Sequence, residues 1–218
     1  MAAAEADVGR LLGVSGAHLA RARAANSALA EAAALPAYER YTGVVHGHLD
    51  VGSLAPAARR RALGSAVVVS GLLGVVGLDD PVPDYRLKMG ASLDPLGKLS
   101  TWWRDRLSRV LNEWLTDRVV IDALPKEHLA AWTPEPDRYA GWVQLRFESV
   151  RRDGSRVAVG HDAKAAKGLV VRHIAASRSR PVASLRAFDA QGWRLDPAAS
   201  ELGAARPGRA AFVREASR

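Results

Sequence analysis

The residue types best suited to binding chemistry follow a short apolar run near residue 70. Residues 66–70, AVVVS, predict a central strand, and a glycine-rich turn over residues 71–77 follows it. Tyr85 and Arg86 come just after this turn. Because ligands gather at the carboxyl ends of strands in open α/β sheets, a guanidinium here suits a phosphate or a carboxylate. The structural alternative is that Arg86 pairs with an acid of its own loop, such as Asp80.

A second group of cations lies on a helix predicted over residues 163–177. Lys164 and Lys167 are three residues apart and share a face, and Arg172 lies about two turns beyond Lys164. Such a stripe beside a cleft suits a phosphate backbone, although a run of charges is often only a solvated helix face. A desolvated Lys164 could also act as a base or a nucleophile.

The N-terminal segment offers a different kind of anion site. Two alanine-rich helices are predicted within residues 4–34, separated by the glycines of GVSG at residues 13–16. This pattern resembles the helix-hairpin-helix motif of DNA-repair proteins. Its glycines let the backbone approach a phosphate, and the second helix offers free N–H groups. Arg21 and Arg23 would add phosphate contacts, whereas the alternative is a plain pair of helices with a glycine turn.

Apolar periodicity predicts the elements that must position these residues. The predicted helices cover residues 55–63, 99–115, 126–132, 163–177 and 182–187. The predicted strands cover residues 41–45, 66–70, 118–123, 142–149, 156–160, 192–195 and 210–214. Asp153-Gly154 indicates a hairpin, and Pro207-Gly208 indicates that the last two strands pair. We expect an α+β (mixed α/β) fold in one compact domain, 1–218, with a small central sheet flanked by helices and a helix-hairpin-helix-like element in 1–36.

Composition narrows the function classes. The 218 residues include 31 basic and 23 acidic side chains, a net charge of +8, which favours polyanionic partners such as nucleic acid or simply reflects an arginine-rich composition. Cysteine is absent, which excludes disulfides and a thiolate nucleophile and suits a reducing cytoplasm. His46 and His48 lack a third ligand, so no metal is expected, and no cofactor fingerprint is present. We expect no membrane span and no signal peptide, and we favour a monomer.

Several short segments carry a family resemblance. Residues 70–90 read SGLLGVVGLDDPVPDYRLKMG, residues 41–44 read YTGV, and residues 163–169 read AKAAKGL, with Arg172 following. In this order the chain resembles the YaaA peroxide-stress family over most of its length. It departs from the family pattern at Gly77, Lys88, Lys167, His46 and His128. The first strand of the family and its lysine-containing loop are not found, so the chain resembles an N-terminally shortened member.

The resemblance implies a cytoplasmic protein that limits peroxide damage, is linked to intracellular iron control and contacts double-stranded or distorted DNA. The residues expected to bind DNA or phosphate are Gly13, Val14, Ser15, Gly16, Arg21, Arg23, Arg86, Lys164, Lys167 and Arg172. The residues expected to line the cleft are Tyr41, Thr42, Gly43, Ser70, Gly71 and Met89. The alternative is an enzyme acting on a nucleotide, a base or another small anionic substrate. Its candidate catalytic residues are Asp80, Tyr85, Arg86 and Lys164.

Overall fold

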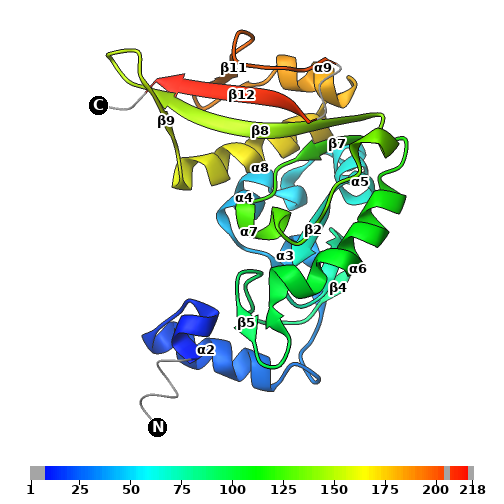
Figure 1. The fold of residues 1–218 in the computed structure, drawn as a ribbon, viewed down its shortest axis with the longest axis vertical. Helices are drawn as coiled ribbons and strands as arrows, with labels where there is room; N and C mark the ends of the chain where they lie inside the picture. Colours follow the sequence, from blue (N-terminus) through cyan, green and yellow to red (C-terminus); the bar gives the residue numbers. More distant parts are fainter. Residues whose placement is uncertain (1–7, 204–206, 216–218) are drawn as a thin grey trace. The chain divides into compact units, whose positions relative to one another are not determined.

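A computed structural model describes residues 8–203 and 207–215 (Figure 1). Helices and small sheets are interspersed along the chain, so the expected α+β class is confirmed. The chain divides into two compact units, each described by itself below. Unit 1 comprises residues 1–40, 66–113 and 124–134, and unit 2 comprises residues 41–65, 114–123 and 135–218. The single-domain boundary stays a prediction. Among the described helices, none has the length and apolar character to cross a membrane.

Unit 1 begins with the predicted pair of helices. Residues 8–12 are helical, a short turn follows, and α2 (Gly16–Ser27) forms the second helix. Gly13 has a φ of 70° and Gly16 a φ of 53°, the left-handed region that glycine adopts without strain. The N–H groups of Gly13 and Val14 both donate to the carbonyl oxygen of Gly9, at 2.8 and 3.0 Å. The glycine turn is therefore confirmed, and the part of the first helix predicted before residue 8 lies outside the described residues.

The apolar run near residue 70 forms a hairpin rather than a central strand. β2 (Val67–Ser70) pairs antiparallel with β3 (Gly74–Gly77), and within the described residues this sheet has two strands. The predicted turn over residues 71–77 is wrong in its second half, because β3 takes those residues. A side chain at Gly74 would meet the Trp103 ring at 2.8 Å, which explains the glycine at this corner.

Short strands and three further helices complete the described part of unit 1. β1 (Leu35–Pro36) leads into α3 (Ala37–Arg40) and pairs with β4 (Pro81–Val82), and β5 (Ser92–Leu93) pairs with β6 (Gly97–Lys98). The predicted amphipathic helix is present as α6 (Leu99–Trp114), with α7 (Lys126–Leu129) following in this unit. Buried Asn112 on α6 accepts from the Trp132 indole N–H at 2.9 Å and donates to the Thr133 carbonyl at 2.9 Å, which fixes the α7 segment on α6.

Unit 2 is built on one mixed sheet. Its strand order is β10 (Asp189–Ala190), β11 (Trp193–Leu195), β12 (Gly208–Glu215), β8 (Gly141–Val150) and β7 (Val119–Asp122), and β9 (Arg156–Ala158) also pairs with β8. Figure 1 shows the long strands β8 and β12 side by side. β12 and β7 both run parallel to β8. The predicted hairpin of β8 with β9 and the pairing of β11 with β12 are confirmed.

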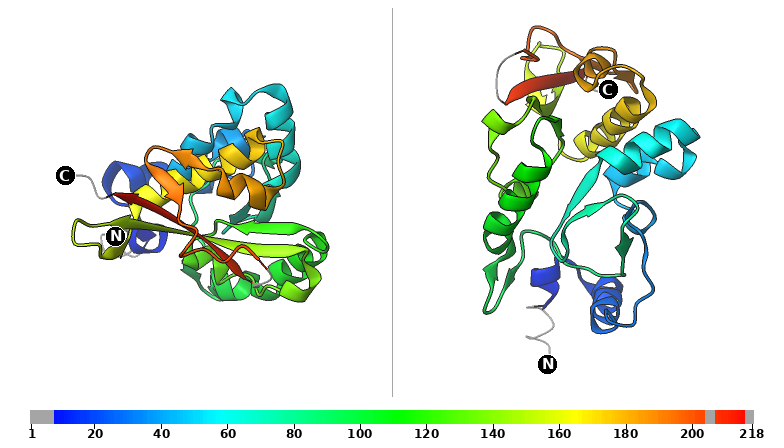
Figure 2. Two further views of the ribbon diagram at one scale, coloured as in Figure 1. Left: turned by 90° about the horizontal axis from the view of Figure 1, so that it is seen from above. Right: turned by 90° about the vertical axis from the view of Figure 1, so that its right-hand side faces the viewer.

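Helix α8 covers one face of this sheet. α8 (His161–Ala176) and α9 (Pro181–Arg186) follow β9, and Figure 2 shows them on one side of β8 and β12. The core between α8 and the sheet is apolar, and its buried members include Val143, Leu145, Phe147, Ala166, Val170, Leu185, Phe188, Trp193, Ala210 and Phe212. Unit 2 also contains α4 (Val44–Leu49), the 3-10 turn η1 (Val51–Ser53), α5 (Pro56–Ser65) and a second 3-10 turn, η2 (Pro136–Arg138).

One predicted strand is wrong. Residues 41–43 are irregular and residues 44–49 form α4, although Val44 and Val45 are β-branched. The reason is packing, because α4 lies directly against α8. A Cβ placed on Gly168 of α8 would be 2.3 Å from the Val45 carbonyl oxygen. Tertiary contact with a glycine of α8 therefore outweighs the strand propensity of the two valines.

Candidate functional site

Ser70 and Tyr85 form the polar centre of the loop that follows β2. The Ser70 hydroxyl accepts from the N–H groups of Leu72 and Leu73 at 3.2 and 3.0 Å, and its oxygen lies 2.7 Å from the Tyr85 hydroxyl. Ser70 is thus the shared hydrogen-bond partner of two N–H groups and one phenol. Ser70 is only 2% exposed. It therefore caps the β2–β3 turn and holds the Tyr85 ring by its phenol oxygen.

Gly71 permits a close approach of two backbone segments at the same place. A Cβ at Gly71 would lie 2.9 Å from the carbonyl oxygen of Leu87, and the Gly71 carbonyl accepts from the Trp103 indole N–H at 2.9 Å. Met89, two residues after Leu87, is fully buried. Of the predicted cleft residues, Ser70, Gly71 and Met89 therefore belong to unit 1, and Met89 is a core residue rather than an exposed wall.

Arg86 is held at both its backbone and its side chain. The Arg86 guanidinium donates to Asp84 at 2.5 Å and to the Tyr85 carbonyl at 2.7 Å. The structural alternative considered for Arg86 is thus present, but its partner is Asp84. Asp80 instead accepts from the backbone N–H of Gly77 at 2.7 Å, which closes the turn after β3. The Arg86 side chain is still 41% exposed, so it can reach a solvent anion without leaving its loop.

Asn26 joins the N-terminal hairpin to this loop. Its side-chain oxygen accepts from the Arg86 N–H at 2.8 Å, and its side-chain nitrogen donates to the Arg86 carbonyl at 2.9 Å. The Asn26 carboxamide thus makes the same pair of hydrogen bonds to the Arg86 backbone that a residue of a neighbouring strand would make. On the other side of the hairpin, the Lys88 ammonium donates to the Arg10 carbonyl at 3.4 Å. The hairpin and the Tyr85–Lys88 loop are therefore one assembly.

The start of α2 has the features expected of a phosphate contact. Ser15 is the N-cap residue and makes no side-chain cap hydrogen bond, and within the described chain no acceptor meets the N–H groups of Gly16, Ala17 and His18. The space where a Gly16 side chain would stand is open for 4 Å. Arg21 is exposed, whereas Arg23 is half-buried. Partly positive N–H groups are thus presented to solvent at the end of a twelve-residue helix.

The predicted cleft residues of unit 2, Tyr41, Thr42 and Gly43, lie in the irregular segment just before α4. Tyr41 stacks on His46 with ring centroids 5.2 Å apart, and burial lowers the pKa of His46. Thr42 and Gly43 are exposed in the irregular segment that precedes α4. Among the described residues, no group of three or more acidic, histidine or cysteine side chains could hold a metal ion.

The predicted cationic stripe on α8 splits into three different environments. Lys164 is exposed. Burial lowers the pKa of Lys167, and Arg146 lowers it further, while the charge of Asp122 acts in the opposite direction. Arg172 donates to the carbonyls of Leu49 and Asp50, at 2.9 and 2.8 Å, at the C-terminus of α4. Arg172 therefore stabilises a helix end, as a cation does there.

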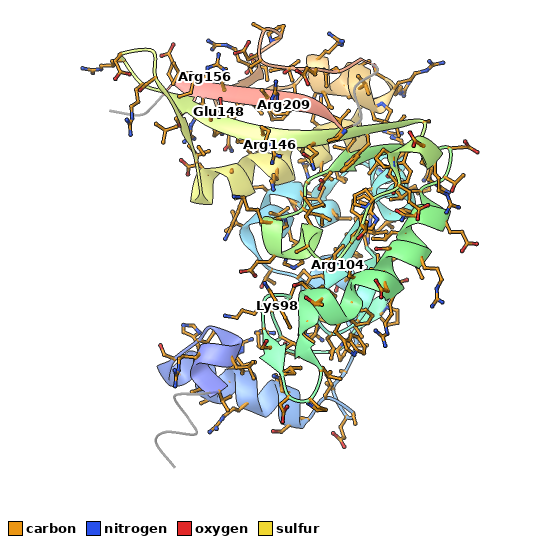
Figure 3. All side chains as sticks on the ribbon, viewed as in Figure 1. Lys98, Arg104, Arg146, Glu148, Arg156 and Arg209 are labelled. Atoms are coloured by element: carbon orange, nitrogen blue, oxygen red, sulfur yellow. The ribbon has the colours of Figure 1, made fainter. Side chains whose placement is uncertain are left out.

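Sequence reasoning missed a polar row on the other face of the unit 2 sheet. Asp122 ends β7, is 7% exposed and accepts from the Gln144 amide at 3.1 Å, and the Gln144 oxygen accepts from Arg146 at 3.0 Å. Alternation of Gln144 and Arg146 with Val143, Leu145 and Phe147 was the available signal. Figure 3 shows Arg146, Glu148, Arg156 and Arg209 along β8, β9 and β12. Arg156 pairs with Asp196 at 2.5 Å and with Glu148 at 3.6 Å.

The candidate catalytic residues fall in both units. Asp80, Tyr85 and Arg86 lie in unit 1, where Ser70 and Asp84 position the last two, and Lys164 lies in unit 2. That Lys164 shares one cleft with Arg86 stays a prediction. The roles predicted for the individual phosphate-binding residues also stay predictions.

Comparison with known proteins identifies the family. A family model described as peroxide stress protein YaaA matches residues 1–199. The chain belongs to this family. A UPF0246 protein of Streptomyces coelicolor is 41% identical over 160 residues, which cover 72% of this chain and 60% of that protein. A UPF0246 protein of Methylibium petroleiphilum is 34% identical over 171 residues, 76% of this chain and 66% of that protein. The chain thus spans between 60% and 66% of the length of these two relatives.

Proposed function

We propose that the chain binds double-stranded or distorted DNA within the peroxide-stress response of its family, in the cytoplasm. In this role it limits peroxide damage and is linked to intracellular iron control. The observation that carries the DNA contact is the N-terminal hairpin. Its second helix begins with solvent-facing N–H groups, and an exposed arginine, Arg21, lies just over one turn further along. Phosphate contacts of this kind position a protein on DNA without reading its sequence.

The attachment of the hairpin supports this proposal. A flexible N-terminal appendage would lose entropy on binding, but the two Asn26 hydrogen bonds to Arg86 fix the hairpin on the rest of unit 1. The Lys88 ammonium lies beside Gly13, 3.0 Å from where a Cβ would stand. A strand that meets the start of α2 would therefore also meet the charge of Lys88. The net charge of +8 favours the encounter with a polyanion.

A matched pair of variants tests the proposal. Arg21→Gln removes an exposed charge from α2, and Arg109→Gln removes an exposed charge from α6 in the same unit. We expect fluorescence anisotropy with duplex and bubble DNA at low salt to show weaker binding for Arg21→Gln and little change for Arg109→Gln. Absence of binding at low salt by the unmodified chain, or equal weakening by both variants, would overturn the proposal.

A second candidate function is an enzyme that acts on a nucleotide, a base or another small anionic substrate. The observation that favours it is Lys167, whose half-buried ammonium has a pKa lowered by burial, as in amines that act as bases or nucleophiles. An abasic nucleotide is a substrate of this class whose open-chain sugar carries an aldehyde. The amine can condense with this aldehyde with loss of water, so borohydride reduction in the presence of abasic-site DNA would trap the resulting Schiff base on such a lysine. We expect that trapping to vanish in Lys167→Gln and to persist in Lys164→Gln, which would assign the role to Lys167 instead of the exposed Lys164 predicted from the sequence. No trapping in the unmodified chain counts against this mechanism.

A further inference from the structure

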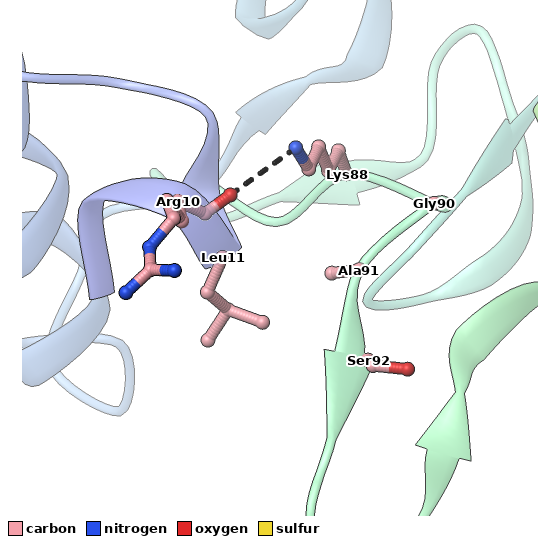
Figure 4. A pocket seen from close by; sticks show the side chains of 6 residues that line it. All are labelled: Arg10, Leu11, Lys88, Gly90, Ala91 and Ser92. Carbon is pink, nitrogen blue, oxygen red and sulfur yellow. Dashed lines mark hydrogen bonds between the residues drawn. The ribbon is translucent and has the colours of Figure 1, made fainter. Parts of the chain in front are cut away.

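A pocket lies where the first helix of the hairpin faces the segment that leads into β5. Its volume is about 370 Å³, and its lining residues are Arg10, Leu11, Lys88, Gly90, Ala91 and Ser92. All six belong to unit 1. Figure 4 shows the Lys88 side chain reaching toward the hairpin helix and the Leu11 side chain between that helix and Ala91. The lining therefore combines the cations of Lys88 and Arg10 and the hydroxyl of Ser92 with the apolar side chains of Leu11 and Ala91.

Lys88 is placed to bind an anion from solution. Its ammonium bonds to the neutral Arg10 carbonyl at 3.4 Å, close to the upper limit for a hydrogen bond, and within the described residues it takes part in no ion pair. An ammonium has three donors, so this contact leaves capacity for a ligand. Gly13 keeps the place open, because a Cβ there would press on the ammonium at 3.0 Å. The lysine is thus held over the pocket without being neutralised by a carboxylate of the described chain.

The rest of the lining defines the ligand class. Leu11 and Ala91 offer apolar surface, and in Figure 4 the Arg10 guanidinium points away from Lys88. An inorganic anion would use only the polar groups of the lining, whereas a phosphate ester would also place its organic group against Leu11. One carboxylate, Glu127, packs against Gly90, whose Cβ would lie 2.6 Å from it, and Glu127 is not a lining residue. The negative charge of Glu127 lowers the affinity of the pocket for an anion.

We propose that this pocket binds the phosphate of a nucleotide, with Lys88 as the charged donor and Leu11 as the wall for the sugar. The phosphate comes either from a DNA strand held by the hairpin or from a free mononucleotide. Binding of a phosphate from a DNA strand rests on the proposed DNA function, whereas binding of a free mononucleotide does not. Because the ammonium is a compact point charge, the pocket selects the phosphate by charge, and Leu11 favours an ester over inorganic phosphate.

Amide NMR of the full chain tests the pocket with dAMP, inorganic phosphate and deoxyadenosine as probes. We expect dAMP to shift the amides of Gly90, Ala91 and Ser92, with weaker effects from phosphate and almost none from the nucleoside. Lys88→Gln should lower dAMP affinity about tenfold, the loss typical of one charge-assisted hydrogen bond. The control Lys98→Gln, an exposed lysine on β6, should leave affinity unchanged, and Glu127→Gln should raise it.

DNA titrations of the same variants separate the two sources of the phosphate. If Lys88→Gln weakens DNA as well as dAMP, the pocket takes a phosphate of the strand. If dAMP binds at these amides while DNA does not bind at all, the pocket stands as a mononucleotide site and the proposed DNA function fails. If DNA binds through Arg21 but dAMP shifts no pocket amide and Lys88→Gln binds DNA normally, the DNA function stands and the pocket inference is overturned.

Discussion

At the scale of single residues, the loop after β2 is held by a few buried polar contacts. Ser70 serves two backbone N–H groups and one phenol oxygen with a single hydroxyl. Ser70 thereby positions Tyr85, while Asp84 and Asn26 position Arg86. The exposed part of the Arg86 guanidinium is thus carried on a loop that several hydrogen bonds hold in place, which is what a binding group requires.

Replacement of Ser70 tests this arrangement. Ser70→Ala leaves the N–H groups of Leu72 and Leu73 without their acceptor and removes the hydrogen bond to the Tyr85 hydroxyl, and buried polar groups without partners are costly. We expect Ser70→Ala to lower the free energy of unfolding by about 2–3 kcal/mol in urea titration. Tyr85→Phe keeps the two N–H bonds to Ser70 and should cost less, about 1 kcal/mol. Equal losses in the two variants would contradict the central role of Ser70.

The half-buried Lys167 gives stability a specific pH dependence. Burial lowers the pKa of Lys167 in the folded chain below the ordinary 10.5. Between the two pKa values the unfolded chain binds the proton and the folded chain does not, so this lysine makes stability rise with pH through that window. Below the window the full cost of the buried charge is present.

We therefore expect Lys167→Met to raise the free energy of unfolding near about pH 7, with a smaller gain near about pH 10. The attraction of Asp122 opposes this effect and limits its size. Lys164→Met, which changes an exposed lysine of the same helix, should alter stability little at either pH. Urea titrations at the two pH values make the comparison. A Lys167→Met variant that loses stability at neutral pH would show that the attraction of Asp122 exceeds the cost of burial.

At the scale of elements, close backbone contact decides what sequence propensity does not. Residues 41–45 contain a tyrosine and two valines and so favour a strand, yet α4 forms because it packs on Gly168 of α8. No local signal marks Gly168 as the partner of Val45. By contrast, α6, α8 and the β8–β9 hairpin follow from periodicity and from the Asp153-Gly154 turn, since those signals are local.

Two glycines, one on α8 and one on α4, should respond in opposite ways to replacement by alanine. A Cβ at Gly168 would stand 2.3 Å from the Val45 carbonyl oxygen, whereas a Cβ at Gly47 on α4 meets nothing within 4 Å. Gly168→Ala should lower the free energy of unfolding by about 2–4 kcal/mol, because backbone atoms must move apart. Gly47→Ala should raise it by about 0.5–1 kcal/mol through helix propensity. Thermal unfolding of both variants tests the contact, and a stabilised Gly168→Ala would refute it.

For the molecule as a whole, the sequence predicted the class and most of the elements but less of the candidate site. The α+β class, the N-terminal pair of helices and the pairing of β11 with β12 follow from periodicity and turn residues. The Asp84 partner of Arg86, the Asn26 contact and the Asp122–Gln144–Arg146 row depend on pairings between segments, which a pattern of residue types does not specify. Charged side chains reveal where an anion could bind, but only the fold shows which cations are already neutralised.

The salt dependence of DNA binding tests how the net charge of the whole chain is used. If binding releases counterions from Z phosphates, the logarithm of affinity falls with the logarithm of salt with a slope of about −0.9Z. We expect Arg21→Gln to reduce this slope by about one unit, because Arg21 would no longer neutralise a phosphate, and Arg109→Gln to leave it unchanged. Both variants lower the net charge equally, so a general effect of +8 predicts equal slopes, whereas contact through the hairpin predicts a change for Arg21→Gln alone. Anisotropy titrations over a range of salt concentrations distinguish these outcomes.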